Sequence, residues 1–324
     1  MKGKTQKNIS ENVSVKDNQK EDEVKNIIEC DNLVRIYKTD ETEVMALQGL
    51  DLSVKKGELM AIIGKSGSGK STLLNIIGGL ERPTVGKVLF NGRDISTFSE
   101  KEIIEYRKKC IGFVWQKSIL NLMPYLNVIQ NLVTYARFNG MSKKKAYEKA
   151  LALLEKVGID NRKESFPLEL SGGEQQRAAI AMSLMCDPLI ILADEPTGAV
   201  DEKTKDKIQE LFRSLNKELG ITIIIVTHDL SLADKVDRVV MISDGKISTE
   251  RILKEEYKNK LNELEDYDLE TLKLSGKESH DEYQLLDKAG RIKLSEDMLM
   301  AAGIDTNRVK VSVVDKNIVI SLDK

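Results

Sequence analysis

A glycine-rich loop at residues 64–71, GKSGSGKS, carries the clearest chemical meaning in the sequence. Its glycines let successive backbone N–H groups turn toward one point, where they can hold phosphate oxygens. Lys70 adds a positive charge for the β- and γ-phosphates, and the hydroxyl of Ser71 is a ligand for Mg²⁺. The spacing GxxxxGK[ST], between a strand-like and a helix-like run, predicts a site for a nucleoside triphosphate. The residues expected to line this site are Gly64, Lys65, Ser66, Gly67, Ser68, Gly69, Lys70, Ser71 and Thr72.

Two adjacent carboxylates, Asp194 and Glu195, follow the apolar run LIILA at residues 189–193. Such a run predicts a buried strand, and open α/β sheets bind ligands at the carboxyl ends of their strands. Asp194 suits the Mg²⁺ shell, and Glu195 can polarise a water for in-line attack on the γ-phosphate. Two acids at a strand end can also be plain surface residues, but the phosphate loop in the same chain favours the catalytic interpretation.

The segment LSGGEQQR at residues 170–177 is a Ser-Gly-Gly turn that leads into a helix-like run. Backbone N–H groups at such a turn form a second cluster that can bind anions. One nucleotide at one site has no use for two phosphate-binding turns, so this turn is expected to close over the nucleotide of another copy. The residues involved are Ser171, Gly172, Gly173 and Glu174.

Alternating strand-like and helix-like runs between Ile28 and about Asp244 must position these groups. Strands are expected at Leu50–Val54, Leu59–Ile63, Ile111–Val114, Leu189–Leu192, Ile221–Val226 and Arg238–Ile242, and helices at Ser71–Gly79, Ser142–Val157 and Lys203–Leu219. Strands that alternate with helices predict a layered α/β fold with a largely parallel sheet. The runs at 189–192 and 221–226 are almost wholly apolar, as expected for strands covered on both faces.

Composition limits the possible functions. The 324 residues carry 50 Lys and Arg against 52 Asp and Glu, whereas a chain that binds nucleic acid over its whole surface is normally basic. Three cysteines far apart, without a CxxC pair, argue against a disulfide framework or a structural zinc site. The first residues lack the apolar stretch of a secretory signal, and no apolar run is long enough to span a bilayer. We therefore expect a soluble protein that reaches a membrane only through a partner.

The sequence is expected to divide into a disordered polar tail at 1–27, a main domain at 28–250, an acidic linker at 251–282 and a small β-rich domain at 283–324. In the last part, Ser295 is the expected N-cap and Gly303 the expected terminator of one short helix, and residues 315–317 form a turn signal. A domain of this size cannot easily form a stable core alone, so it is expected to need a second copy.

LSGGEQQR, beside a phosphate loop and an acid pair, resembles the motif of ATP-binding subunits of ABC transporters, and the resemblance runs from about Ile28 to Glu250. It implies a P-loop ATPase cassette with a helical subdomain, ATP and Mg²⁺ as cofactors, and hydrolysis coupled to transport. It also implies that Tyr37 stacks on adenine, Gln116 contacts Mg²⁺ and the attacking water, Asp201 belongs to the D-loop, and His228 contacts the γ-phosphate. From the residues alone, Tyr37 could be ordinary packing and His228 a satisfied strand-end histidine.

The segments TVGKVLFNGRDIS and PTGAVD resemble the MacB/LolD/FtsE branch of that family. This branch implies a separate membrane permease of the FtsX or MacB kind and a position at the cytoplasmic face of the cell membrane. It implies release of lipoproteins, export of antimicrobials or peptides, or mechanical signalling. The segment KSILNLM between Gln116 and Pro124 is two residues longer than the spacing expected for the branch, which leaves the cargo open.

Residues 285–322 resemble the AbrB/SpoVT-type swapped-hairpin domain, with Ser295 in place of the usual proline. In that family two copies interlace their strands, which implies a homodimer, and many members bind DNA. Residues 284–324 hold seven Lys and Arg against six Asp and Glu, so DNA is not the expected partner.

A soluble DNA- or regulator-associated ABC ATPase that uses the carboxyl-terminal domain is the alternative function. ATPases of DNA repair usually carry a long coiled coil or a zinc insert between the phosphate loop and the Ser-Gly-Gly turn. Here Ser171 follows Lys70 by only 101 positions, without sustained heptads or a cysteine cluster. The transport ATPase is therefore the favoured interpretation.

Overall fold

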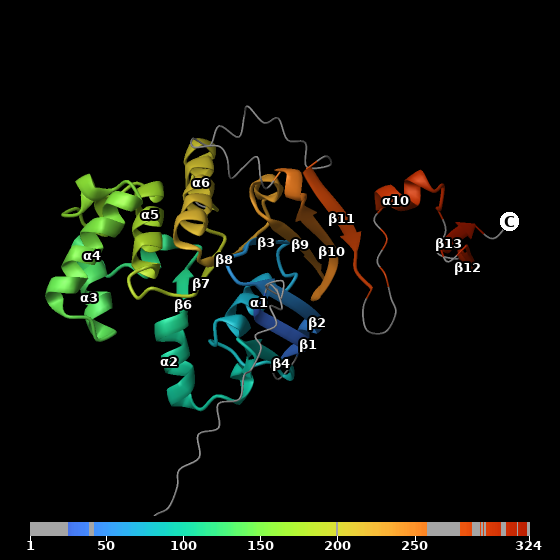
Figure 1. Ribbon diagram of the computed structural model, residues 1–324, viewed down its shortest axis with the longest axis horizontal. Coiled ribbons are helices and arrows are strands. Elements are labelled where there is room, and N and C mark those ends of the chain that lie inside the picture. The colour runs from blue at the N-terminus through green and yellow to red at the C-terminus, as the bar shows by residue number, and fades with distance from the viewer. Residues whose placement is uncertain are drawn as a thin grey trace, which may run out of the picture.

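The structure is a computed structural model that describes residues 25–38, 42–198, 200–257, 279–286, 292, 294, 296–305, 309–315 and 317–322. Figure 1 shows a central sheet, a group of helices on one side of it, and a separate hairpin toward the carboxyl terminus. The expected tail up to residue 24, most of the expected linker and the expected N-cap Ser295 lie outside the described residues. None of the helices in the described part is long and apolar enough to cross a membrane.

A seven-stranded sheet forms the centre, in the order β11-β10-β9-β3-β8-β7-β6. Its strands are β3 (Leu59–Ile63), β6 (Ile111–Val114), β7 (Ile190–Asp194), β8 (Thr222–Thr227), β9 (Arg238–Ser243), β10 (Lys246–Leu253) and β11 (His280–Gln284). The strands from β9 to β6 run parallel, whereas β10 and β11 are antiparallel to their neighbours. The largely parallel α/β sheet is therefore confirmed, with two antiparallel strands at one edge.

A second, antiparallel sheet has the order β2-β1-β4-β5. Its strands are β1 (Asn26–Lys38), β2 (Glu43–Lys55), β4 (Val85–Phe90) and β5 (Arg93–Asp94). The expected run Leu50–Val54 is the second half of β2. The pairing of β1 with β2 is interrupted by register shifts, which break the simple alternation by which a strand is recognised in a sequence.

The described α-helices of the main domain begin at polar caps, except the first, which begins at Gly69. They are α1 (Lys70–Ile77), α2 (Glu100–Cys110), α3 (Val128–Phe138), α4 (Lys143–Lys156), α5 (Gly172–Ser183) and α6 (Glu202–Leu219). Ser99, Asn127 and Ser171 each begin a helix with a capping box, which satisfies backbone N–H groups that have no partner inside the helix. The three helices expected from the sequence agree with α1, α4 and α6 within two residues at each end.

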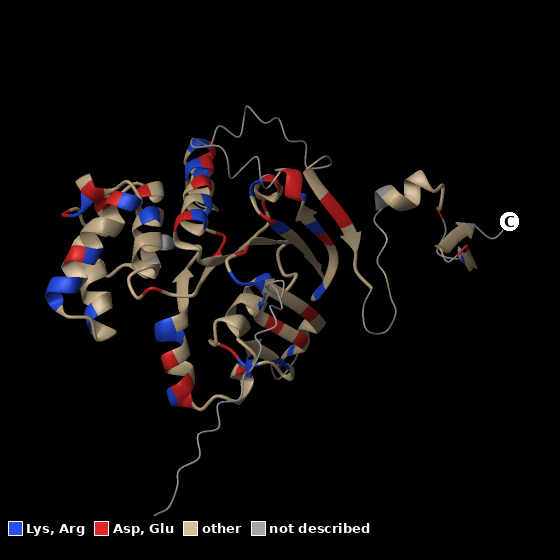
Figure 2. Cartoon of the chain, in the orientation of Figure 1, with Lys and Arg blue, Asp and Glu red and all other residues tan. Residues whose placement is uncertain are grey.

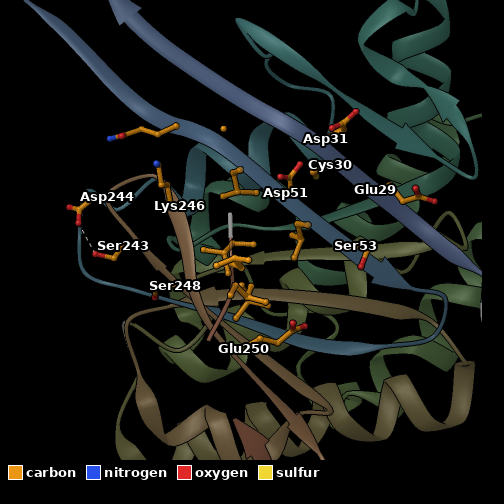
Figure 3. Close-up of a pocket in the computed structure, with 18 of the residues that line it drawn as sticks. Glu29, Cys30, Asp31, Asp51, Ser53, Ser243, Asp244, Lys246, Ser248 and Glu250 are labelled. Carbon is orange, nitrogen blue, oxygen red and sulfur yellow. Dashed lines mark hydrogen bonds between the residues drawn. The ribbon is translucent and has the colours of Figure 1, made fainter. Parts of the chain in front are cut away.

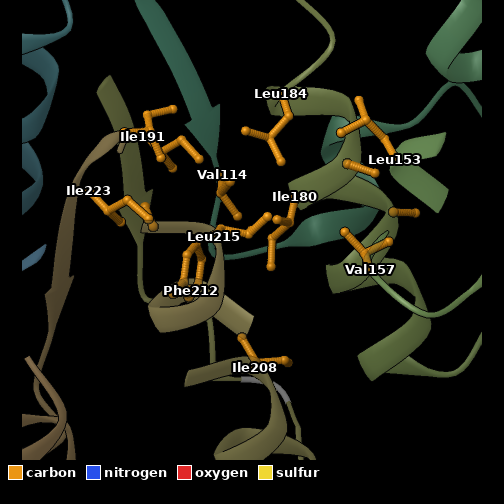
Figure 4. Packing of buried hydrophobic residues seen from close by; sticks show 14 of the residues in the cluster. Val114, Leu153, Val157, Ile180, Leu184, Ile191, Ile208, Phe212, Leu215 and Ile223 are labelled. Atoms are coloured by element: carbon orange, nitrogen blue, oxygen red, sulfur yellow. The ribbon is translucent and has the colours of Figure 1, made fainter. Parts of the chain in front are cut away.

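Side chains of β3 alternate between two hydrophobic cores, because successive residues of a strand point to opposite faces. Leu59, Ala61 and Ile63 pack in the core shared with α3 to α6, and the residues between them pack in the core shared with α1 and the antiparallel sheet. Figure 4 shows the first core, where Phe212 of α6 lies between the sheet and the helices. In Figure 2 charged residues gather on α2, α4 and α6, and the central strands are nearly free of them.

The chain leaves the main domain after β10 and returns to it as β11. Leu253 pairs with His280 and Thr249 pairs with Gln284, so β11 becomes the edge strand of the central sheet. His280 is 4% exposed. Residues 251–253 and 280–282, which the sequence placed in a linker, thus lie in the sheet.

Beyond β11 the structure describes a short helix and a hairpin. Helix α10 (Glu296–Ala301) is followed by Gly303, whose φ of 67° suits the expected helix terminator. Strands β12 (Val309–Val314) and β13 (Asn317–Leu322) pair in antiparallel register, with the expected turn between them.

Candidate functional site

The phosphate loop connects β3 to α1 and is folded around the side chain of Lys70. The Nζ atom of Lys70 donates to the carbonyl oxygens of Gly64 at 2.8 Å and Lys65 at 3.0 Å. The residue is only 7% exposed, so its ammonium group lies inside the loop. The N–H of Gly64 donates to the carbonyl of Thr227 at the end of β8, which fixes the loop to the neighbouring strand.

Glycine is required in this loop for space as well as for conformation. A Cβ atom at Gly64 would lie 2.3 Å from the carbonyl oxygen of Ile242. At Gly69 it would lie 2.4 Å from the carbonyl oxygen of Ala46, and the φ of 100° is one that L side chains rarely adopt. The Oγ atom of Ser68 is buried without a hydrogen-bond partner among the residues that the structure describes. A ligand rich in oxygen atoms, such as a triphosphate, fits such a cradle.

The turn between β9 and β10 supports the phosphate loop from outside the motif. The N–H of Gly245 donates to the carbonyl of Ser68 at 3.1 Å, and the N–H of Gln48 donates to the carbonyl of Gly245 at 3.0 Å. A Cβ atom at Gly245 would lie 2.6 Å from the carbonyl oxygen of Ala46. Asp244-Gly245 is a turn signal in the sequence, but its contact with a loop more than 170 positions earlier has no sequence signal.

The acid pair lies beside the phosphate loop, and its two carboxylates have different partners. The hydroxyl of Ser71 donates to Asp194 Oδ1 at 3.1 Å. Burial raises the pKa of Asp194, with the neighbouring Glu195 acting in the same direction, while the hydrogen bond from Ser71 and the charge of Lys70 oppose the rise. A divalent cation next to Asp194 would offset the free-energy cost of burying its negative charge. A hydroxyl group beside a carboxylate is also a set of oxygen ligands that suits Mg²⁺.

Glu195 points toward the end of β8. Its Oε2 atom accepts a hydrogen bond from the hydroxyl of Thr227 at 3.0 Å, and its Oε1 atom lies 2.9 Å from Nδ1 of His228. The Glu195 side chain is 12% exposed and that of His228 is 67% exposed. The structure thus brings together Asp194, Glu195 and His228, and it adds Thr227, which the sequence analysis did not single out.

Gln116 and Tyr37 also lie near this centre. Gln116 follows β6, and its Nε2 atom is 3.7 Å from where a Cβ of Gly198, in the loop after the acid pair, would stand. The hydroxyl of Tyr37 donates to Glu81 at 2.6 Å and lies 3.4 Å from Thr72 Oγ1. The Arg35 guanidinium carbon lies 4.6 Å from the centroid of the Tyr37 ring. Tyr37 therefore lies beside the first turn of α1, and stacking on adenine stays a prediction.

The Ser-Gly-Gly turn lies on the other side of the central sheet from the phosphate loop of the same chain. Ser171 caps α5, which packs in the core shared with α3 to α6, whereas α1 packs in the opposite core. Glu174 closes the capping box and pairs with Arg162 at 2.7 Å. Asp201 caps α6 by accepting from Thr204, whose side chain lies against Gly173. The turn and Asp201 are therefore neighbours.

A groove of about 840 Å³ lies between the antiparallel sheet and β10. Figure 3 shows Asp51 and Ser53 of β2 facing Lys246 and Glu250 of β10 across it. Leu285, Leu286 and Ile292 complete its lining. None of the residues that the sequence analysis assigned to the nucleotide site lines this groove.

Residues 47–198 match the protein family described as ABC transporter. A lipoprotein-releasing system ATP-binding protein LolD from Syntrophus aciditrophicus is 43% identical over 223 residues, which cover 69% of this chain and 99% of that protein. A macrolide export ATP-binding/permease protein MacB from Pasteurella multocida is 41% identical over 221 residues, which cover 68% of this chain and 34% of that longer protein. The dimeric post-hydrolysis structure of the ATP-binding cassette MJ0796, bound to ADP and Pi, has a TM-score of 0.65 and 38% identity, and the match covers 70% of this chain and 99% of that chain.

Gly245→Ala is expected to weaken ATP binding about tenfold, because the new Cβ displaces the carbonyl of Ala46 and pulls the turn away from Ser68. The matched control is Gly92→Ala, where φ is 78° and nothing lies within 4 Å of the new Cβ. Equilibrium titration of both variants with ATP measures the effect. Equal affinities in Gly245→Ala and Gly92→Ala would show that the turn does not support the phosphate loop.

Proposed function

The chain belongs to the ABC transporter family, as a subunit that binds and hydrolyses ATP, and on this premise we propose how its residues carry out the reaction. The observation that carries the proposal is the position of Glu195. This carboxylate lies next to Asp194 and the phosphate loop, and it is held there by Thr227 and His228. A fixed carboxylate beside a triphosphate cradle is placed to accept a proton from the attacking water.

Binding depends on the phosphate loop and on Asp194. Lys70 exchanges the carbonyl oxygens of Gly64 and Lys65 for the β- and γ-phosphates, and the backbone N–H groups of the loop hold the remaining oxygens. Ser71 and Asp194 would hold Mg²⁺, assisted by Gln116, and the bound cation would supply positive charge beside the phosphates. Tyr37 stacks on the adenine of ATP, and His228 contacts the γ-phosphate.

Glu195→Gln is expected to bind ATP normally and to lower the turnover number by a factor of about 10²–10⁴, because an amide keeps the shape of the side chain but cannot accept a proton from water. ATP titration and phosphate release measure the two quantities separately. Glu105→Gln on the exposed surface of α2 is the control and should behave as wild type. Near-wild-type turnover of Glu195→Gln would remove Glu195 as the base.

Two copies of the chain are needed for a complete site in this proposal. Helix α5, which the Ser171 turn begins, and helix α1, which follows the phosphate loop, pack in opposite cores of the central sheet, and this supports a contact of the turn with the nucleotide of another chain. The related cassette MJ0796 has been solved as a dimer bound to ADP and Pi. We propose that Ser171, Gly172, Gly173 and Glu174, with Asp201 nearby, close over the nucleotide held by the second copy.

A mixture of two inactive variants tests this arrangement. Lys70→Ala should lose ATP binding, and Ser171→Arg should bind ATP but fail to hydrolyse it. Mixed dimers contain one site with both lesions and one site with neither, so random mixing restores roughly a quarter of the wild-type activity. An inactive mixture would show instead that the Ser171 turn acts on the nucleotide of its own chain.

We propose a membrane permease of the FtsX or MacB kind as the partner, and a position at the cytoplasmic face of the membrane. Val128 and Ile129 donate backbone hydrogen bonds to the carbonyls of Ser165 and Lys163, which joins the segment before α3 to the segment at 163–168. Large apolar side chains are exposed on both segments, with Tyr125 at 89% and Leu168 at 77%. Exposed apolar side chains of this kind mark protein interfaces. The cargo is of the lipoprotein, peptide or antimicrobial class.

We also propose that the carboxyl-terminal part is an AbrB/SpoVT-like dimerisation domain. In the hairpin of β12 and β13, Val311, Val313 and Ile318 are 61%, 75% and 71% exposed. A two-stranded hairpin is marginally stable on its own, and a second copy would cover these side chains. A twofold axis through this domain can coincide with that of the cassette dimer.

The double variant Val313→Glu/Ile318→Glu tests the hairpin, because the two residues are opposite each other and would place like charges on one face. The wild type is expected to be a dimer without ATP, and the double variant a monomer, as measured by light scattering. Ser321→Glu, on the other face, is the control. A wild type that is monomeric without nucleotide would contradict the dimerisation role and favour the regulator- or DNA-associated alternative.

A further inference from the structure

Thr227 lies where the end of β8, Asp229 and the side chain of Glu195 meet. It is the last residue of β8, and it is 2% exposed. Its hydroxyl accepts a hydrogen bond from the N–H of Asp229 at 3.1 Å and donates one to Glu195 Oε2 at 3.0 Å. Because a hydroxyl has one proton, the bond from Asp229 leaves that proton free to point at the carboxylate. A β-branched side chain also has few rotamers, so the donor is held in place.

Glu195 needs such a support. Its backbone has a φ of 45°. This left-handed conformation is unfavourable in free energy for any residue that has a side chain. Its N–H donates to the carbonyl of Val226, and its own carbonyl accepts from the N–H of Gly198. These bonds hold the main chain, but the direction of the side chain depends on Thr227 and His228.

Asp229 joins this support to α6. Its Oδ2 atom lies 2.9 Å from Nζ of Lys205, and both side chains are largely buried, at 20% and 14% exposure. Ser231 also donates to Asp229 through its N–H and its hydroxyl. Burial alone would raise the pKa of Asp229, but the bonds from Lys205 and Ser231 hold the pKa below its ordinary value. The pair is therefore ionised at neutral pH.

Lys205 connects the Asp229–Lys205 pair to the Ser-Gly-Gly turn. Lys205 lies in the first turn of α6, and its N–H donates to the carbonyl of the cap residue Asp201 at 2.8 Å. Thr204, the residue before it, packs against Gly173 of the Ser-Gly-Gly turn. A line of contacts thus runs from that turn through the start of α6 to Asp229, Thr227 and the carboxylate of Glu195.

We propose that Thr227 and the Asp229–Lys205 pair are positioning residues that hold the Glu195 carboxylate in its hydrolytic orientation and tie it to the Ser-Gly-Gly turn of the same chain. This inference rests on the proposed role of Glu195 as the base. None of the three residues contacts the reacting atoms, so their loss affects turnover and leaves ATP affinity unchanged.

The full chain provides a direct test. Thr227→Val keeps the shape but removes the donor, and the turnover number should fall ten- to hundredfold, while the ATP affinity and the melting temperature of the ATP-bound protein change little. Thr227→Ser keeps the hydroxyl and should stay within about threefold of wild type. Lys205→Met should lower turnover, and the double variant with Thr227→Val should be no slower than the slower single variant.

The matched control is a second ion pair between the same two elements. Lys235, in the short 3-10 helix Leu230–Lys235, pairs with Asp206 of α6 at 2.5 Å but does not contact Thr227 or Glu195. Lys235→Met should therefore keep wild-type turnover. Equal losses in Lys235→Met and Lys205→Met would overturn the proposal, because they would show a general role of this contact in stability.

The Glu195→Gln background separates this inference from the proposed function. If Glu195 is the base and Thr227 orients it, adding Thr227→Val to Glu195→Gln should cause no further loss in single-turnover hydrolysis. A further tenfold loss would overturn the positioning role of Thr227 and leave Glu195 as the base. If Glu195→Gln alone keeps its turnover, the assignment of the base fails, and the positioning role fails with it.

Discussion

Complete burial of two neighbouring inner strands of the central sheet, β3 and β8, is the constraint on which the rest of the molecule depends. All residues of β3 and β8 are buried, so neither strand can place a polar side chain in a cleft along its length. Polar chemistry is confined to the carboxyl ends of the parallel strands, where the chain turns into loops. β3 leads into the phosphate loop, β7 ends in the acid pair, and β8 ends at Thr227. The site is thus assembled from segments far apart in the sequence because they share one open edge.

The acid pair shows how this edge separates two neighbouring residues. Asp194 is the last residue of β7 and faces Ser71, whereas Glu195 has left the strand in a left-handed conformation and faces β8. The two carboxylates therefore have separate environments, one suited to a cation and the other to proton transfer. The strained backbone of Glu195 is what allows two acids that are adjacent in the sequence to have different functions.

The sequence was sufficient for features that depend on local pattern. The apolar runs of β3 and β6 and the glycine spacing of the phosphate loop are local, and the predicted bounds of both strands agree with the structure. Features that depend on tertiary pairing could not be predicted. β11 is polar and charged, HDEYQ, and becomes a strand only because β10 offers it an edge. No sequence motif assigns a role to Thr227 or Gly245, and their importance comes from hydrogen bonds to residues distant in the sequence.

Because the chain returns to the central sheet as β11, the main domain extends beyond the carboxyl-terminal boundary expected from the sequence. The main domain was expected to end at Glu250, but β10 continues to Leu253 and is covered by residues 280–284. A protein shortened to residue 250 would keep the nucleotide site and lose the outer strand of its sheet. The exposed N–H and C=O groups of β10 would then be available to pair with other chains, which is a common route to aggregation. The carboxyl-terminal extension therefore also covers the edge of β10, a task separate from any role in assembly or regulation.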